Sequence, residues 1–574
     1  MSSTAGGAGV EGGGDFSVNA IRGSLREAAM RRGTRVLLFE GGEPGRSRRP
    51  CLVALVLLVS ASGCYAPDFD VVIVGGTIYD GSGGEPYVAD VGISHGMIEE
   101  IGDLAARTAF ETVDASGLAV TPGFIDAHSH AEMDESWGSH GQEFLTQGIT
   151  TVVLGLDGGG PFRVAERLDA WDRNGLGVNA MTFVGHNAIR REVMGLDARA
   201  PTDEELDRMK ALVRQGMEGG AFGLSTGLFY TPGTFSETEE VIELAKVAAE
   251  WDNAIYDTHD RDLGATFQGV GYDASVAEGI RIGEESGLRV IFSHFNPQGA
   301  NNYGRANVGA QMIEDARARG VEVWAAQHPY TATQSNLRSY ALPRWASGGG
   351  TDAVLARFEH PDTGSILRTQ IMESLAMRGG PEKIMIVDED PDLNGRTLAE
   401  RATEWEISVP DAVQRIIESN GNASVMNLEL YDIDNTRYLA RMDWMMTCTD
   451  GRTPSDGQAV THPRVYGAFP RKLRQFAIEG DDIAIPFAIR SFSGLAADFF
   501  GLDDRGYVEE GRIADVAVID LETYRDVSTM EDPHHFSEGV VHVLINGVFA
   551  IHDEERTGVM GGKALRAPWT HSER

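Results

Sequence analysis

The stretch Gly123-Phe-Ile-Asp-Ala-His-Ser-His130 decides the fold, because a short apolar strand runs directly into two histidines. His128 and His130 are two residues apart, so in an extended chain both side chains point to the same face. Two imidazoles on one face can bind one metal ion. Asp126, inside the same stretch, is expected to be structural.

Seven more short apolar runs follow this stretch, most of them separated by segments with helical patterning. The eight predicted strands are 123–128, 150–155, 180–186, 221–227, 254–259, 290–294, 321–327 and 444–449. Strands that alternate with helices pair in parallel, and eight such strands close a (β/α)8 barrel of the TIM type. The sequence therefore predicts an α/β barrel.

Polar side chains stand at the ends of these strands. They are Asp157 after the second strand, His259 and His294 at the fifth and sixth, and Asp450 after the eighth. Strand ends meet at the mouth of a barrel, where active sites form. Imidazole and carboxylate suit zinc and related ions. Taken singly, each could be a surface histidine or a helix-capping aspartate, but their coincidence on one side favours a metal site.

Other histidines carry less information. His186, at the end of the third strand, is compatible with a substrate contact or with a helix cap. His462 lies outside the expected barrel core and is given no role. Tyr230 and Arg261, at the mouths of the fourth and fifth strands, are candidate substrate contacts. The alternative for both is packing or a salt bridge.

Both ends of the chain are rich in β-like runs, which predicts a small β-sandwich built from the two ends. The long gap between the seventh and eighth strands predicts an inserted, largely helical segment. The expected organisation is a leader and linker (1–68), a first sandwich part (69–121), a barrel (122–485) with an insertion at about 345–440, a last barrel helix with the second sandwich part (486–566), and a tail (567–574).

Composition narrows the possible functions. With 49 basic and 86 acidic residues, the net charge is −37, which argues against a nucleic-acid partner. Hydrophobic residues make up 42%, as in ordinary globular proteins. The cysteines are Cys51, Cys64 and Cys448, too few for a disulfide framework or a multi-cysteine zinc site. A metal must therefore be held by histidines and carboxylates.

The N-terminal region resembles a bacterial lipoprotein signal. Arg46, Arg48 and Arg49 precede the apolar run 51–59, and small residues lead to Cys64. The run is too short to span a bilayer but suits a signal-peptide core. The resemblance implies cleavage before Cys64, a lipid anchor there, and a periplasmic or cell-surface location. The alternative is a mis-annotated extension holding a buried apolar strand, in which case the protein is cytoplasmic.

From about residue 69 to 565 the chain resembles the amidohydrolase superfamily, and within it the D-aminoacylase (N-acyl-D-amino-acid deacylase) group. The histidine pair after Gly-Phe-Ile-Asp is typical of the superfamily. The stretch Gly223-Leu-Ser-Thr-Gly-Leu-Phe-Tyr-Thr-Pro-Gly233 is more specific to the group.

The resemblance implies roles for individual residues. His128, His130, His259 and His294 would ligate one or two zinc-type ions, and Asp450 would be the catalytic aspartate. Arg464, in His-Pro-Arg-Val-Tyr-Gly, would pair with the substrate α-carboxylate. Tyr330, in a segment that matches Tyr-Pro-Tyr-Thr of the group, would be a further substrate contact.

Three segments depart from the group. Asp157 stands where the group has a metal-ligating cysteine, and a carboxylate can still ligate or bridge a metal. The usual His-Lys after the sixth-strand histidine reads Phe295-Asn296, and the usual Tyr-Pro-Tyr-Thr begins with His328. Many relatives in the wider superfamily use a carboxylated lysine at the end of the fourth strand as an anionic metal ligand. None of the five lysines of this chain lies there, so Asp157 is the better candidate for the anionic ligand.

The expected function is metal-dependent hydrolysis of the amide bond of N-acyl amino acids, with D-chirality implied by the resemblance. The partner would be a small N-acyl amino acid substrate. One alternative is an amidohydrolase that acts on a cyclic amide or a dipeptide. The other is a lipoprotein that binds a ligand without catalysis.

Overall fold

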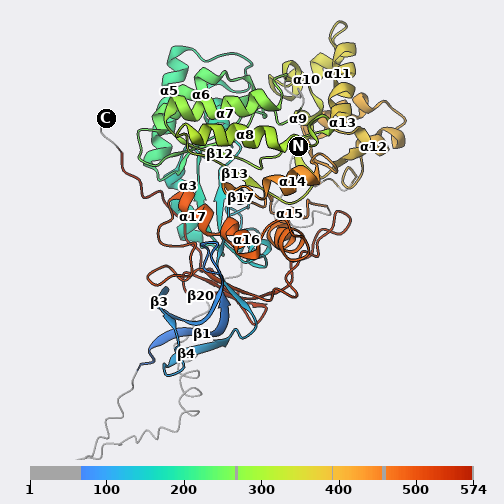
Figure 1. The fold of residues 1–574 in the computed structure, drawn as a ribbon. Helices are drawn as coiled ribbons and strands as arrows, with labels where there is room; N and C mark the ends of the chain where they lie inside the picture. The colour runs from blue at the N-terminus through green and yellow to red at the C-terminus, as the bar shows by residue number, and fades with distance from the viewer. Residues whose placement is uncertain (1–65, 265–268, 389, 391, 456–459, 572–574) are drawn as a thin grey trace, which may run out of the picture. The chain divides into compact units, whose positions relative to one another are not determined.

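The computed structural model describes residues 66–264, 269–388, 390, 392–455 and 460–571. The leader, with Cys51 and Cys64, lies outside the described residues. Among the helices of the described residues, none is long and apolar enough to cross a membrane. Figure 1 gives the labels of the elements.

All eight predicted barrel strands are present, with the third one split into two short pieces. They are β6 (Phe124–Asp126), β7 (Ile149–Leu154), β8 (Asn179–Thr182) with β9 (Val184–Gly185), β10 (Gly223–Gly227), β11 (Ile255–His259), β12 (Arg289–Phe292), β13 (Val323–Gln327) and β17 (Met445–Thr447). Neighbouring strands pair in parallel, in the order β6-β7-β8 and then β9-β10-β11-β12-β13-β17.

The barrel closes between β6 and β17. The Ala127 amide donates to the Thr447 carbonyl at 3.3 Å, and the Asp450 amide donates to the His128 carbonyl at 2.9 Å. The buried Asp126 carboxylate fastens the same seam, because it accepts hydrogen bonds from the backbone amide and the hydroxyl of Thr449. Asp126 is therefore structural, as expected.

Apolar side chains alternate across the barrel wall. One core cluster takes side chains from seven of the eight barrel strands, namely Ile125, Val153, Met181, Ile255, Ile291, Ala326 and Met446, and α17 (Gly494–Phe500) packs on it. The outer helices are α3 (Val164–Asn174), α5 (Asp203–Glu218), α6 (Thr238–Ala248), α7 (Tyr272–Ser286), α8 (Ala306–Ala318), α14 (Ile433–Leu439) and α16 (Ile485–Phe492). Helix α5 shows how they form: a Thr202–Glu205 capping box starts it, and Met209, Val213 and Met217 make its buried stripe.

Shorter helices complete the barrel ends and the loops beside them. They are α2 (Gln142–Leu145), α4 (His186–Met194) and α15 (Arg464–Lys472), which continues into the π-helical segment Leu473–Ile478. Helix α15 packs against α2, and its first residue is Arg464. This placement brings Arg464 to the mouth of the barrel.

Strands from both ends of the chain join in one nine-stranded sheet, as the sequence suggested. Its N-terminal strands are β1 (Phe69–Ile78), β2 (Tyr87–Ser94), β3 (Met97–Gly102), β4 (Ala109–Asp114) and β5 (Ala119–Pro122), and its C-terminal strands are β18 (Val516–Ile519), β19 (Val540–Ile545), β20 (Val548–His552) and β21 (Glu555–Arg556). Strand β18 pairs antiparallel with β5, which joins the two ends. One core cluster draws on both halves, for example Ile73 and Val518.

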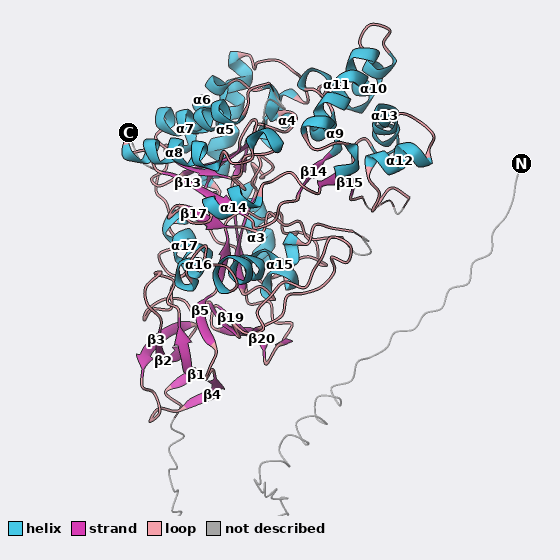
Figure 2. Ribbon diagram, turned by 45° about the vertical axis from the view of Figure 1, so that its right-hand side comes forward, coloured by secondary structure: helices cyan, strands magenta, loops and turns pink. Residues whose placement is uncertain are grey.

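The insertion between β13 and β17 has its own core and is not only helical. It contains the three-stranded sheet β14 (Thr333–Asn336), β16 (Ser424–Asn427) and β15 (Ile384–Ile386), with α9 (Leu337–Ala341), α10 (Gly350–Glu359), α11 (Gly364–Met377), α12 (Leu398–Glu404) and α13 (Val409–Asn420). Figure 2 shows these elements and the nine-stranded sheet at opposite ends of the barrel. We use "the insertion" for residues 333–427. Helix α14 packs on α8 of the barrel instead.

Candidate metal centre

The predicted metal ligands all lie at the carboxyl ends of barrel strands. His128 follows β6, His259 ends β11 and His294 follows β12. Three of the site residues have left-handed backbones, with φ of 55° at Asp157, 32° at His294 and 47° at Asp450. Such conformations are uncommon outside glycine and concentrate at functional sites. The strand ends thus turn sharply and aim these side chains at one point.

Close backbone packing fixes Asp157 in particular. A Cβ at Gly227, the last residue of β10, would lie 2.2 Å from the Asp157 carbonyl oxygen. A glycine at the end of β10 therefore lets the loop after β7 approach it closely.

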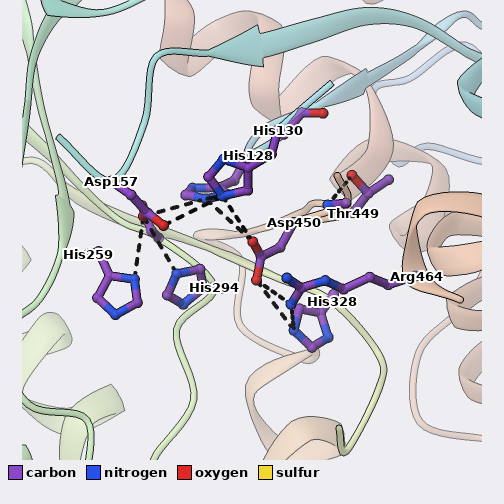
Figure 3. Close-up of polar contacts among 12 residues, drawn as sticks. His128, His130, Asp157, His259, His294, His328, Thr449, Asp450 and Arg464 are labelled. Carbon is purple, nitrogen blue, oxygen red and sulfur yellow. Dashed lines mark hydrogen bonds and ion pairs between the residues drawn. The ribbon is translucent and has the colours of Figure 1, made fainter. Parts of the chain in front are cut away.

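The Asp157 carboxylate lies among four imidazoles (Figure 3). Its Oδ1 is 3.4 Å from His259 Nδ1, 3.6 Å from His128 Nε2 and 3.7 Å from His294 Nε2. Its Oδ2 is 3.5 Å from His130 Nε2. Asp157 therefore faces both histidine pairs, as a bridging ligand would.

Asp450 forms a second group with the first histidine pair. Its Oδ1 is 3.3 Å from His130 Nε2 and 3.7 Å from His128 Nε2. The two Nε2 atoms of His128 and His130 are themselves 3.3 Å apart. Two overlapping sets of three ligands result: His128, Asp157 and His294, and His128, His130 and Asp450.

These separations fit a metal ion. All of them exceed the 2.7–3.2 Å of an ordinary N–H···O hydrogen bond. Ligand atoms about 2.1 Å from one ion in tetrahedral coordination lie roughly 3.4 Å apart, as here. The donor set, four imidazoles and two carboxylates, is also one that zinc prefers. The residues present therefore fit one or two zinc ions.

The electrostatics point the same way. Burial lowers the pKa of His128 to about 3, so its imidazole is neutral, as a ligand must be. Burial raises the pKa of Asp157, but His259 and His128 outweigh it and hold that pKa well below its usual value. Burial lowers the pKa of His130, yet Asp157 and Asp450 bring it to about 9, so zinc binding at His130 must displace a proton. Two ionised carboxylates at this point thus attract a cation.

Asp450 links this cluster to Arg464. The Arg464 guanidinium donates a short hydrogen bond from Nη1 to Asp450 Oδ2, and the same Nη1 is 3.2 Å from His328 Nε2. Burial raises the pKa of Asp450, but the charges of Arg464 and His294 hold it well below its usual value. The buried Arg464 Nε has no hydrogen-bond partner among the described residues, which leaves it available to a ligand.

A cavity of about 650 Å³ opens onto this cluster. Its barrel side includes His130, Asp157, Tyr230, Asp450, Arg452 and Arg464, and its other side comes from the insertion. A volume of this size is typical of small-molecule sites. The structure thus places His130, Asp157 and Asp450 in the wall of a pocket.

Of the predicted substrate contacts Tyr230, Arg261 and Tyr330, only Tyr230 lines the cavity. Tyr230 lines the cavity, and its ring centroid is 4.5 Å from that of His259. Arg261 is not among the cavity's lining residues, because Glu278 holds its guanidinium through two hydrogen bonds of 2.8 Å. Tyr330 is also buried away from the lining, with its ring 4.6 Å from the Arg471 guanidinium. For Arg261, the salt bridge considered as the alternative is what the structure contains.

Two further residues that the sequence analysis named have structural roles. His186 Nε2 is 2.9 Å from Glu240 Oε1, and this buried pair with Arg190 is structural. Asn296 is likewise structural, since it donates to Thr436 at 2.8 Å.

Sequence reasoning missed His328 and His462. His328 contacts Arg464, and its place directly after β13 is the strand-end signal that identified the other ligands. His462, which we placed outside the barrel core, is buried, and its Nδ1 accepts the Arg464 amide at 3.1 Å. Its position two residues before Arg464 was the available signal. Both histidines fix the position of Arg464.

The chain is similar to well-studied proteins over most of its length. A family model described as the amidohydrolase family matches residues 111–551. A D-aminoacylase of Alcaligenes xylosoxydans xylosoxydans is 33% identical over 523 residues, which covers 87% of this chain and 97% of that protein.

Two solved structures are similar over comparable lengths. One is a D-aminoacylase with a binuclear metal centre, activated by one metal and attenuated by a second (TM-score 0.73, 30% identity, 87% of this chain and 100% of that one). The other is an N-acyl-D-glutamate deacylase of Bordetella bronchiseptica with zinc and a phosphonate mimic of the tetrahedral intermediate (TM-score 0.74, 29% identity, the same coverage).

Proposed function

This chain belongs to the amidohydrolase family, and from that premise we propose that it hydrolyses the amide bond of N-acyl-D-amino acids. The products are a carboxylate and a free D-amino acid. One observation carries the proposal: Asp450 places one oxygen against the ligand cluster and the other on Arg464, inside an open cavity.

His128, His130, Asp157, His259 and His294 would hold zinc, which would supply the Lewis acidity for activating water and polarising the scissile carbonyl. Asp450 is the proton carrier. Its carboxylate is ionised at neutral pH, so it accepts a proton from the attacking water and returns it to the leaving nitrogen. Arg464 holds Oδ2, which keeps Oδ1 turned toward the reacting atoms.

Arg464 also suits the substrate α-carboxylate. It is the first residue of α15, so the helix N-terminus adds positive potential beside its charge. Its planar fork has donors beyond the one that Asp450 uses, and a carboxylate can accept them. Tyr230, whose pKa is raised well above its usual value by burial and by Asp157, stays protonated and can donate a hydrogen bond.

The geometry favours this reaction over cyclic-amide hydrolysis and over ligand binding without catalysis. A cyclic amide lacks the free carboxylate that Arg464 would bind. A ligand-binding lipoprotein would gain nothing from an ionised aspartate beside a metal cluster.

The test is amine release from paired N-acetyl-D- and N-acetyl-L-amino acids by protein loaded with zinc. We expect turnover of the D series, lost in Asp450→Asn. Turnover of neither series by metal-loaded protein would contradict the proposal and direct attention to other amides.

We further propose that the protein is lipid-anchored at Cys64 and works outside the cytoplasm. Support comes from the arginines, the apolar run 51–59 and the small residues before Cys64. Radiolabelled palmitate fed to expressing cells should appear in the wild-type protein and not in Cys64→Ser. Equal labelling of both, or of neither, would contradict the anchor.

A further inference from the structure

The cavity beside the metal centre has two chemically different walls. The barrel wall carries the ligand cluster and two cations, Arg452 and Arg464. The insertion wall carries carboxamides, hydroxyls and one carboxylate, from Gln334, Ser335, Asn336, Asp388, Asn420, Asn422 and Ser424. A substrate that fills the cavity must meet both walls.

The carboxylate on the insertion wall is Asp388, two residues after β15. Its Oδ1 accepts hydrogen bonds from the Asn420 side chain at 3.3 Å and from the Asp390 amide at 3.1 Å. These neutral donors orient the carboxylate but leave its charge uncompensated. No lysine, arginine or histidine of the described residues lies within 4.0 Å of it, although many other acids of this chain have such a partner.

The surroundings of Asp388 favour a cation. Carboxamide and hydroxyl oxygens accept hydrogen bonds from ammonium or guanidinium groups. Among the described residues, the insertion wall has no cationic side chain to receive an anion. A carboxylate brought to Asp388 would be repelled, whereas a cation would gain a charge-assisted hydrogen bond.

The barrel wall carries two arginines beside the metal-ligand cluster. Arg452 lines the cavity, is exposed, and forms no ion pair within the described part of the chain. With Arg464 it makes this wall suited to the carboxylate end of a substrate. Opposite charges on the two walls would orient a molecule that has a carboxylate at one end and a cation at the other.

Resting on the proposed N-acyl-D-amino acid hydrolysis, we propose that the substrate carries a cationic amine that binds Asp388 on the insertion wall. The amine can come from two sources. It is either the basic side chain of the D-amino acid or the free amino group of an aminoacyl group, as in a dipeptide. Both sources present the same ammonium chemistry to Asp388.

Two pairs of compounds separate the sources. N-acetyl-D-lysine is compared with N-acetyl-D-norleucine, which lacks the charge, and glycyl-D-alanine with propionyl-D-alanine. We expect kcat/KM to favour the cationic member of one pair by about tenfold or more, as for hydrogen bonds between charged groups. Preference in the first pair identifies a basic side chain, and preference in the second identifies an aminoacyl group.

Variants test whether Asp388 is the cause. In Asp388→Asn the preference should fall to about one. The matched control is Asp392→Asn, which removes the same charge from an exposed position that does not line the cavity. It should keep the preference.

Two results would overturn the inference. One is native protein that cleaves the neutral member of both pairs as well as, or better than, the cationic member. The other is a preference that survives in Asp388→Asn. If no compound releases amine, the proposed hydrolysis is wrong. Calorimetry of the same pairs on the zinc-loaded protein then shows whether the cationic member of either pair binds more tightly than the neutral member. Equal Kd values within both pairs would then overturn it.

Discussion

The barrel mouth and the insertion wall face the same cavity but are built differently. The mouth takes its charged groups from strand ends, with left-handed backbones at Asp157, His294 and Asp450, of which His294 and Asp450 are buried. The insertion wall takes its polar groups from β14, β16, the residues after β15 and the end of α13, where Asp388 and Asn420 are partly or largely exposed. The comparison indicates that the barrel carries the chemistry and the insertion selects the substrate.

The variant Asp450→Asn tests most severely the claim that the barrel carries the chemistry. The change removes the proton carrier, so we expect kcat to fall by about 10²–10⁴-fold for every substrate. Steady-state assays across several substrates check this, with zinc content and thermal unfolding as controls. A variant that keeps more than a tenth of the wild-type kcat would show that Asp450 carries no proton.

Asp157 tests whether the carboxylate between the histidine pairs is a ligand. Losing an outer-shell partner costs roughly 10–100-fold in metal affinity, and loss of a direct anionic ligand should cost more. We expect Asp157→Asn to lose zinc during dialysis against a weak chelator, and Asp157→Cys to retain it. Elemental analysis measures both. Equal zinc in Asp157→Asn and wild type would exclude Asp157 from the ligand set.

Arg464 is proposed both to orient Asp450 and to bind the substrate carboxylate. A variant at this position therefore tests how far catalysis and binding are separate. Arg464→Lys keeps the charge but loses the planar fork that reaches Asp450 and a carboxylate together. We expect kcat/KM to fall by about 10–100-fold, through both KM and kcat, from losing hydrogen bonds to charged groups. A change confined to kcat would mean that Arg464 only orients Asp450.

The insertion wall should respond far less. Gln334 lines the cavity and donates to Ser424 at 2.9 Å, so Gln334→Ala removes one neutral hydrogen-bonding group. We expect relative kcat/KM values among substrates to change by less than about tenfold. Competition assays with mixed substrates measure this. A loss of activity as large as that of Asp450→Asn would contradict the assignment of catalysis to the barrel and of substrate selection to the insertion.

A buried lysine of the barrel, outside the cavity lining, should affect stability and not chemistry. Burial lowers the pKa of Lys472 to about 7, against about 10.4 for an exposed lysine. Between these values the unfolded chain binds one more proton than the folded chain, so stability should rise with pH from about 7 to 10. Lys472→Met should abolish this part of the rise. Urea unfolding of both proteins at several pH values tests it, and identical pH profiles would contradict it.

The sequence predicted the barrel well because its information is local. Each strand is a contiguous apolar run, and each site residue ends its strand or follows it within four residues, so His128, Asp157 and Asp450 could be placed without knowledge of the packing. The joining of the two chain ends into one small β domain also followed from their β-like runs. These predictions needed only the rule that parallel strand ends meet.

The rest depends on contacts between distant residues. Arg261 ends a strand, yet Glu278 on α7 holds it away from the cavity, and no pattern in the sequence predicts that pairing. The strands β14 and β16 have four residues each and are almost 90 residues apart in the sequence. Because such short and distant strands give no local signal, the insertion was predicted to be largely helical. Asp388, Asn420 and Ser424 lie far from β14 in sequence, and only the folded insertion brings them to the cavity.

The most direct test of the account is a zinc titration of metal-stripped protein, followed by amine release from an N-acyl-D-amino acid. The account predicts no turnover without metal and activity that appears as zinc fills the site formed by His128, His130, Asp157, His259 and His294. Full activity in the stripped protein, or zinc bound at that site without any turnover of the D series, would contradict it.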